Sequence, residues 1–165
     1  IVTVLTMVQK KQTTFVEMSE EKIAECLAKL KANTPAVWGH MSAQHMIEHL
    51  EYTYRIASGE IQDFEVATPE KILEKVHATL YNYEKMPREF DFPLAQESRI
   101  AELVHPDLEA AKAAMLEARA HYLAYFKEHP EARTRNVVFG ELNRFEWYLL
   151  ERKHLNHHFE QFGLI

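Results

Sequence analysis

The sequence predicts an all-α protein built around four main helices. Only 4 Gly and 6 Pro occur in 165 residues, whereas 47% of the residues are hydrophobic, and this balance disfavours a turn-rich β fold. Apolar residues recur at helical spacing in four stretches, and a capping residue stands before each of them. The length suits one domain with its own core.

The first two main helices begin at serine caps. Ser19 is followed by two acidic residues, which suit the positive end of a helix dipole, and its helix should end before Thr34-Pro35. Ser42 caps the second helix, which should run to about Ser58 and stop at Gly59. The expected buried positions are Ile23, Cys26, Leu27 and Leu30 on the first helix and Ala43, Met46, Leu50, Tyr54 and Ala57 on the second.

A long connection separates the second and third main helices. Thr68-Pro69-Glu70 places a cap, a proline and an acid in the order of a helix start, so a shorter helix is expected over roughly 69–83. Two prolines within 86–104 indicate an irregular crossover loop.

Two further caps predict the last two main helices. Pro106-Asp107 opens an alanine-rich helix that His129-Pro130 ends, and Asn143 with Glu146 forms a capping box for the final helix. The expected seam of the third helix is Leu108, Ala111, Met115, Ala118, Tyr122 and Tyr125 or Phe126. Four main helices with one long connection describe a four-helix bundle.

The first residues differ from the rest of the chain. Ile1 to Val8 is apolar and β-branched, which predicts a buried or edge strand, yet no partner strand follows nearby. We therefore expect residues 1–18 to form an N-terminal arm, and residues 19–165 to form the bundle. One interpretation makes the arm the tail of a preceding domain in a longer protein; the alternative is a simple ordered or frayed arm.

Charge and hydropathy exclude several function classes. The net charge is −6, and no Lys/Arg cluster stands out, so neither nucleic acid nor an anionic membrane is an expected partner. No apolar run of about 18 residues predicts a membrane helix, and we expect a cytoplasmic protein. The single cysteine, Cys26, excludes an internal disulfide and should be a buried hydrophobe.

Three histidines in the final helix point to a metal site. His154 and His158 are an i, i+4 pair that can hold one ion, and both should border an apolar stripe made by Tyr148, Leu155, Phe159 and Phe162. His157 lies about 160° from that stripe and should face solvent. On the second helix His49 points inward better than His45, so His49 is the expected third ligand.

Three imidazoles and a solvent molecule would leave an open coordination position, as in catalytic sites. Imidazole suits several divalent metals, and Gln161 lies on the side of His154 where it could support a ligand. Two alternatives stay open: histidines satisfied at the edge of a core, and a surface pair without any ion.

These residues resemble the pattern of the DinB-like (DinB/YfiT) superfamily of metalloenzymes. The pattern has a His midway along helix 2 and His-x-x-x-His-x-x-Gln on helix 4, here His49, His154, His158 and Gln161. The stretches Trp38–Gln44 and Phe139–Leu142 resemble one uncharacterised branch.

The resemblance implies an up-down-down-up bundle with a long crossover over 60–105 and a three-His site for a divalent metal, most often Ni or Zn, with Fe as a further option. It also implies thiol-dependent transferase or isomerase chemistry in some relatives. The chain departs from the branch at Val137-Val138, where His-Pro is expected before Phe139-Gly140. Separately, Thr3–Val8 resembles the last strand of a MaoC-like acyl-CoA hydratase domain.

Two main functions follow from these patterns. The first is a metal-dependent hydrolase or thiol transferase acting on a small molecule, with His45, Glu48 or Glu151 as candidate bases. The second is a non-catalytic accessory or oligomerisation module, appended to a MaoC-like domain or forming a homodimer, in which Trp38 and Trp147 supply apolar contact area. A purely structural helical domain is a third alternative.

Overall fold

The computed structural model describes residues 14–88 and 102–165. This part of the chain is mostly helical, as the sequence predicted. The elements in chain order are α1 (Glu20–Lys29), α2 (Ala43–Ala57), α3 (Glu70–Ala78), the 3-10 helix η1 (Thr79–Tyr81), α5 (Leu108–Glu128), β1 (Thr134–Asn136), β2 (Gly140–Leu142) and α6 (Arg144–Gln161). The strand predicted for residues 1–8 and much of the predicted crossover loop lie outside the described residues.

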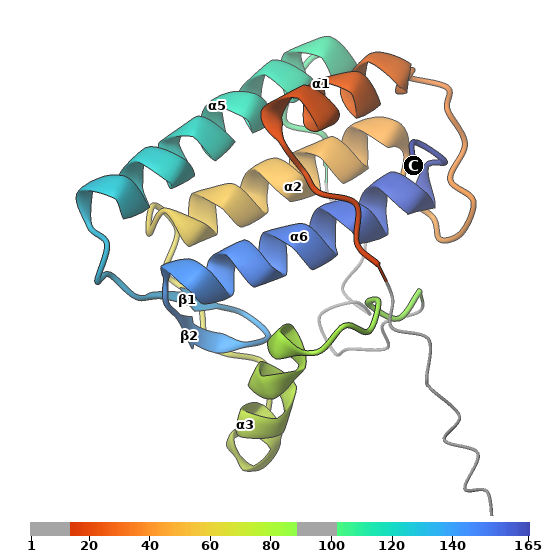
Figure 1. Ribbon diagram of the computed structural model, residues 1–165. Coiled ribbons are helices and arrows are strands. Elements are labelled where there is room, and N and C mark those ends of the chain that lie inside the picture. The colour runs from red at the N-terminus through yellow and green to blue at the C-terminus, as the bar shows by residue number, and fades with distance from the viewer. Residues whose placement is uncertain (1–13, 89–101) are drawn as a thin grey trace, which may run out of the picture.

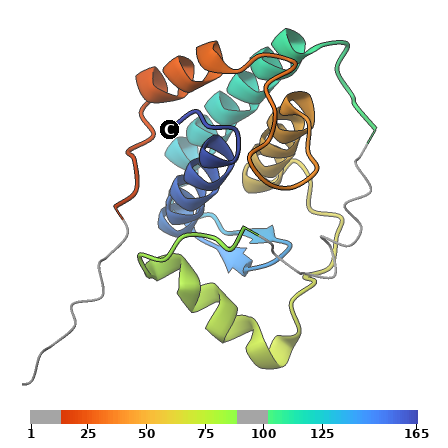
Figure 2. The same ribbon diagram turned by 90° about the vertical axis from the view of Figure 1, so that its right-hand side faces the viewer.

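Four of the helices lie side by side and enclose the core. Helices α2 and α5 run in one direction, and α1 and α6 run in the opposite direction (Figure 1). Seen from the side, the β1–β2 hairpin lies below these helices, and α3 lies beyond the hairpin (Figure 2). The largest fully buried side chains include Met46 and Leu50 of α2, Met115 and Phe126 of α5, and Leu155 and Phe159 of α6.

The predicted caps of the four main helices are confirmed, whereas the cap predicted at Thr68 was wrong: Pro69 is the N-cap of α3, and the Thr68 hydroxyl donates to the Val138 carbonyl. The side chains of Ser19, Ser42 and Asp107 each accept a hydrogen bond from the backbone N–H three residues on, and Asn143 and Glu146 form the capping box of α6. The predicted buried positions of α1 and α2 are confirmed as well. Of the two alternatives on the third main helix, Phe126 is buried and Tyr125 only partly so.

Helix α1 ends at Lys29, before Thr34-Pro35 as predicted, because Leu30 already has an extended backbone and its N–H bonds back to the Leu27 carbonyl. The end of the next helix was predicted too late. The helix predicted over 69–83 stops being α-helical at Ala78 and tightens into η1, which ends at Tyr81. Helix ends are the least certain part of such a prediction, because the last turn is often a 3-10 turn.

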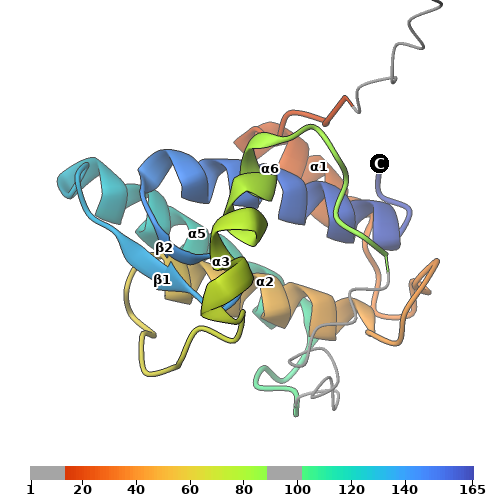
Figure 3. The same ribbon diagram turned by 90° about the horizontal axis from the view of Figure 1, so that it is seen from below.

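The predicted apolar stripe of α6 was wrong at Tyr148, which is 41% exposed, whereas Trp147 and Leu150 are buried. Tyr148 borders an open groove beside α5, whereas much of the rest of α6 is covered on several sides (Figure 3). The arm reaches it where the Asn156 side chain pairs with both backbone groups of Val16, and η1 reaches it where Lys153 donates to the Thr79 carbonyl.

The short antiparallel hairpin was not predicted. Thr134 pairs with Leu142 and Asn136 with Gly140, so each strand has only three residues, too few for a period-two pattern. Its turn is held by the Asn136 side chain, which accepts hydrogen bonds from the N–H groups of Val138 and Phe139. Gly140 follows with a positive φ of 74°.

The hairpin is joined to the helices by a buried hydroxyl. Thr134 accepts a hydrogen bond from the Trp147 indole N–H at 2.7 Å and donates to the Ala57 carbonyl at the end of α2, at 2.9 Å.

Thr134→Val should therefore lower the free energy of unfolding by about 2 kcal/mol, because it leaves the buried Trp147 N–H and the Ala57 carbonyl without a partner. Urea unfolding measures this loss; Thr134→Ser, which keeps the hydroxyl, is the control and should lose clearly less. Equal losses in the two variants would show that the methyl group, and not the bonds, matters.

Candidate metal centre

Three histidines from two helices converge in the interior. The Nε2 atoms of His49 on α2 and His154 on α6 lie 2.9 Å apart, and those of His158 and His154 lie 3.1 Å apart. One nitrogen from each of the three rings lies within 4.8 Å of the others, so the three lie close enough to hold a metal ion. The three rings lie close together because His154 and His158 are spaced i, i+4 on α6 and His49 faces them from α2, as the helical geometry predicted.

The ligand atoms suit a small divalent ion. Tetrahedral zinc with Zn–N bonds of 2.0–2.1 Å requires about 3.3 Å between ligand nitrogens. The His49–His154 and His154–His158 pairs are therefore within a few tenths of an ångström of that spacing. His154 and His158 are 9% and 6% exposed. Burial lowers the pKa of His49 to about 4, and burial together with the neighbouring rings holds the pKa of His154 and of His158 well below 6.5. Neutral rings with free lone pairs are the form that binds metal.

Gln161 selects the metal-binding tautomer of His158. Its side-chain N–H donates to the Trp38 carbonyl at 3.1 Å, which turns its oxygen toward His158 Nδ1 at 2.8 Å. Because that oxygen only accepts, His158 Nδ1 must carry the proton, and Nε2 keeps its lone pair for the ion. The Trp38 carbonyl was not foreseen as part of the site.

The loop beside Trp38 fits tightly around Gln161. Gly39 has a φ of 78°, and a Cβ there would lie 3.0 Å from the Gln161 side-chain nitrogen. The Val37 N–H also donates to the Gln161 carbonyl at 2.7 Å. The Trp-Gly pair noted in the sequence therefore serves to hold Gln161 in place.

The prediction that His157 faces solvent was wrong. Its ring packs edge-on against Trp38, with 5.6 Å between ring centroids, and is only partly exposed. Burial lowers its pKa. The helical-wheel estimate failed here because the 35–42 loop folds over the side of α6 that the wheel assigned to water.

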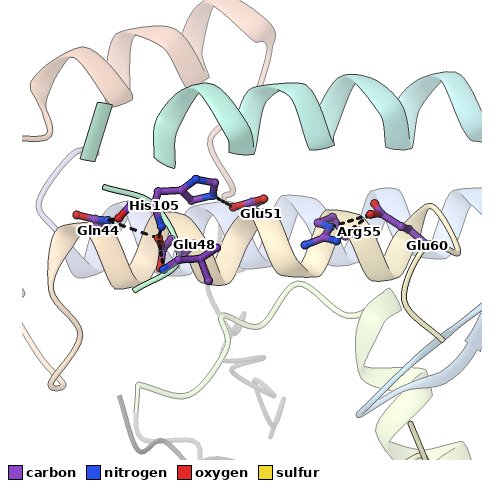
Figure 4. A network of polar contacts seen from close by, with 7 residues as sticks. Gln44, Glu48, Glu51, Arg55, Glu60 and His105 are labelled. Carbon is purple, nitrogen blue, oxygen red and sulfur yellow. Dashed lines mark hydrogen bonds and ion pairs between the residues drawn. The ribbon is translucent and has the colours of Figure 1, made fainter. Parts of the chain in front are cut away.

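Two of the candidate bases bind other parts of the chain. The Glu48 carboxylate accepts hydrogen bonds from the N–H groups of Val104 and His105, and the neighbouring Glu51 binds the His105 ring at 2.6 Å (Figure 4). These contacts fasten the end of the crossover to α2. His45 Nδ1 lies 2.5 Å from the Ser42 hydroxyl at the helix cap.

Glu151 lies one turn before His154 on α6. It accepts hydrogen bonds from Arg119 Nε at 2.8 Å and from the Tyr54 hydroxyl at 3.2 Å, and a small internal cavity is lined by Glu151, Tyr54 and His154 together. Among the three candidate bases, Glu151 thus lines a cavity together with one of the clustered histidines. Burial is the main cause that raises the pKa of Tyr54 well above 10, and the Glu151 carboxylate is the second.

Cys26 is fully buried, as predicted, and its thiol points to the Leu164 carbonyl at 3.8 Å. Burial raises its pKa, which suits a core residue and not a nucleophile.

No protein family, curated protein or solved structure shows a significant match to the chain. Within residues 14–88 and 102–165, no helix is both long and apolar enough to cross a membrane.

The lowered histidine pKa values predict an acid-sensitive fold in the metal-free protein. Below pH 6.5 an unfolded histidine takes up a proton, whereas folded His49 does so only near pH 4. The unfolded state then binds more protons, so stability present at pH 7 is lost as the pH falls toward 4, by at most about 1.4 kcal/mol per pH unit for each histidine. Urea unfolding in a chelator, at several pH values, measures this slope. A His154→Leu, His158→Leu variant should give a flatter curve; an unchanged slope would assign the effect to other groups.

Proposed function

We propose that this chain is a DinB-like metal-binding protein whose His49, His154 and His158 hold Ni or Zn, with Fe as the less favoured ion. We further propose that it acts as a metal-dependent hydrolase or thiol transferase on a small molecule. The convergence of three neutral, buried imidazole nitrogens carries the proposal, because buried polar atoms of this kind are stabilised by a ligand that they share.

The arrangement of helices supports the DinB-like part of the proposal. The directions of α1, α2, α5 and α6 are those of an up-down-down-up four-helix bundle, and the long connection falls between α2 and α5 (Figure 1). The ligand order along the chain also fits, with one His on the second helix of the bundle and two on the last.

A three-His set leaves at least one coordination position for water or a thiol, and a bound divalent ion lowers the pKa of that group enough to make a nucleophile near neutral pH. The residues around it have separate tasks. Gln161 holds His158 in the ligand tautomer, and Glu151, already bonded to Arg119, can take a proton or orient a donor beside His154.

Metal content is the first test of the proposal. The purified chain, loaded with Ni or Zn and desalted, should hold close to one ion per chain, and a His154→Ala, His158→Ala variant should hold almost none. Elemental analysis with circular dichroism, which verifies the fold, makes the comparison. A His121→Ala, His129→Ala variant removes two exposed histidines of the α5 region and should keep its metal. Equal metal in all three proteins would refute the three-His site.

The role of Gln161 can be tested by separating its acceptor from its donor. Gln161→Leu should weaken metal binding by about 10- to 100-fold, because His158 loses the partner that fixes its tautomer. Gln161→Glu keeps an acceptor for the Nδ1 proton and should retain most of the affinity. Competition with a chromophoric chelator gives the two constants. If both variants bind as tightly as the parent, Gln161 has no supporting role.

A further inference from the structure

A groove between α5 and the first half of α6 lies outside the metal centre. It encloses about 650 Å³ and is bounded by both helices, by the arm at Met18 and by the segment that leads to the hairpin. None of the three histidines lines it. Its size falls in the range of small-molecule sites, roughly 300–1,000 Å³.

The groove exists because α1 is short. Helix α1 has 10 residues against 21 in α5 and 18 in α6, so it covers only one end of the face that these two helices share (Figure 1). At the other end the apolar side chains Leu123, Phe145 and Tyr148 remain 39%, 56% and 41% exposed. Such a concentration of large exposed apolar groups along one cavity is typical of a binding surface.

The apolar walls of the groove are largely aromatic. Tyr122 and Phe126 of α5 lie at its base, with ring centroids 5.8 Å apart, and Phe145 and Tyr148 of α6 form a stacked pair with centroids 6.2 Å apart and planes 28° from parallel. Flat rings on both sides favour a flat aromatic ligand, since offset stacking adds to the burial of its faces.

Two arginines that line the same groove have hydrogen-bond donors without an acceptor among the described residues, although the Arg152 guanidinium also lies over the Phe15 and Tyr83 rings. Arg144 is the first residue of α6, and it forms no hydrogen bond or ion pair with residues 14–88 or 102–165. A cation at a helix N-terminus is opposed by the helix dipole, so an anion beside Arg144 would relieve an unfavourable interaction. Within the same described ranges the buried Nε of Arg152 also has no hydrogen-bond partner.

Four arginines and three glutamates line the groove, so its lining carries a formal charge of +1 on a chain whose net charge is −6. Glu151 is paired with Arg119, and Glu17 receives a long hydrogen bond from the Tyr148 hydroxyl, 3.5 Å, at the arm end. The third acid, Glu131, is exposed. The lining as a whole therefore favours an anion over a cation.

We propose that the α5–α6 groove is a second ligand site, which binds a small aromatic carboxylate with its ring between the α5 and α6 aromatic side chains and its carboxylate on Arg144. A guanidinium binds a carboxylate through two parallel N–H donors, which fixes the orientation of the ligand.

Calorimetric titration of the chelator-treated full chain tests the proposal. The probe is 2-naphthoate, and its neutral isostere is 2-naphthamide. Naphthoate should bind at one site, about tenfold more tightly than naphthamide, and Arg144→Gln should remove that difference, since the charged hydrogen bonds are lost. The control is Arg55→Gln, which removes the same charge from α2, where Arg55 forms an exposed ion pair with Glu60. This variant should bind naphthoate as the parent does.

Two further variants complete the test. Leu123→Glu places a charge in the apolar wall and should abolish binding of both probes, whereas the His154→Ala, His158→Ala variant should bind naphthoate as the parent does. No binding of naphthoate at millimolar concentration, or equal binding by the parent and Arg144→Gln, would overturn the proposal. Loss of naphthoate binding in the double histidine variant with its fold intact would place the ligand at the metal centre and would also overturn it.

Discussion

The polar side chains buried along α6 determine how the rest of the chain is placed. A buried donor or acceptor without a partner costs free energy, so each of these groups must be met by another segment. Asn156 binds the arm at Val16, Lys153 donates three hydrogen bonds to η1 and the residues after it, and Gln161 binds the Trp38 loop. Glu146 is met by His77 of α3. The segments around α6 are therefore positioned by hydrogen bonds as much as by apolar contact.

The histidine cluster is one exception to this satisfaction, and the buried Nε of Arg152 on the same helix is another. His158 donates to the Gln161 oxygen from Nδ1, but its Nε2, like the Nε2 of His49 and of His154, meets only other imidazoles. Three neutral rings cannot each donate and accept within such a cluster, and protonation is opposed by burial and by the neighbouring rings. A cation at the centre would satisfy all three lone pairs at once, which a fold without an ion cannot do.

Helix spacing was enough to predict that the three histidines meet, whereas the groups around them needed the tertiary structure. The i, i+4 relation of His154 and His158 is set by α-helical geometry, so sequence alone could place them together. Three features depend on loops that fold back over α6 and α2: the Trp38 carbonyl, the packing of His157 and the anchoring role of Glu48. No local sequence pattern predicts how these loops fold back. The same limit explains Tyr148, which a single-stripe wheel placed in the core, and the hairpin, whose strands are too short for a periodic pattern.

Helix α6 combines two chemically different ends. Toward its C-terminus, polar and aromatic neighbours enclose the histidines and exclude most of the solvent. At its N-terminus, Arg144 is exposed, although the helix dipole there favours a negative charge. Glu151 lies between the two ends and lines both the groove and the cavity beside the histidine cluster. Its pairing with Arg119 leaves Arg144 as a groove cation without a carboxylate partner among the described residues.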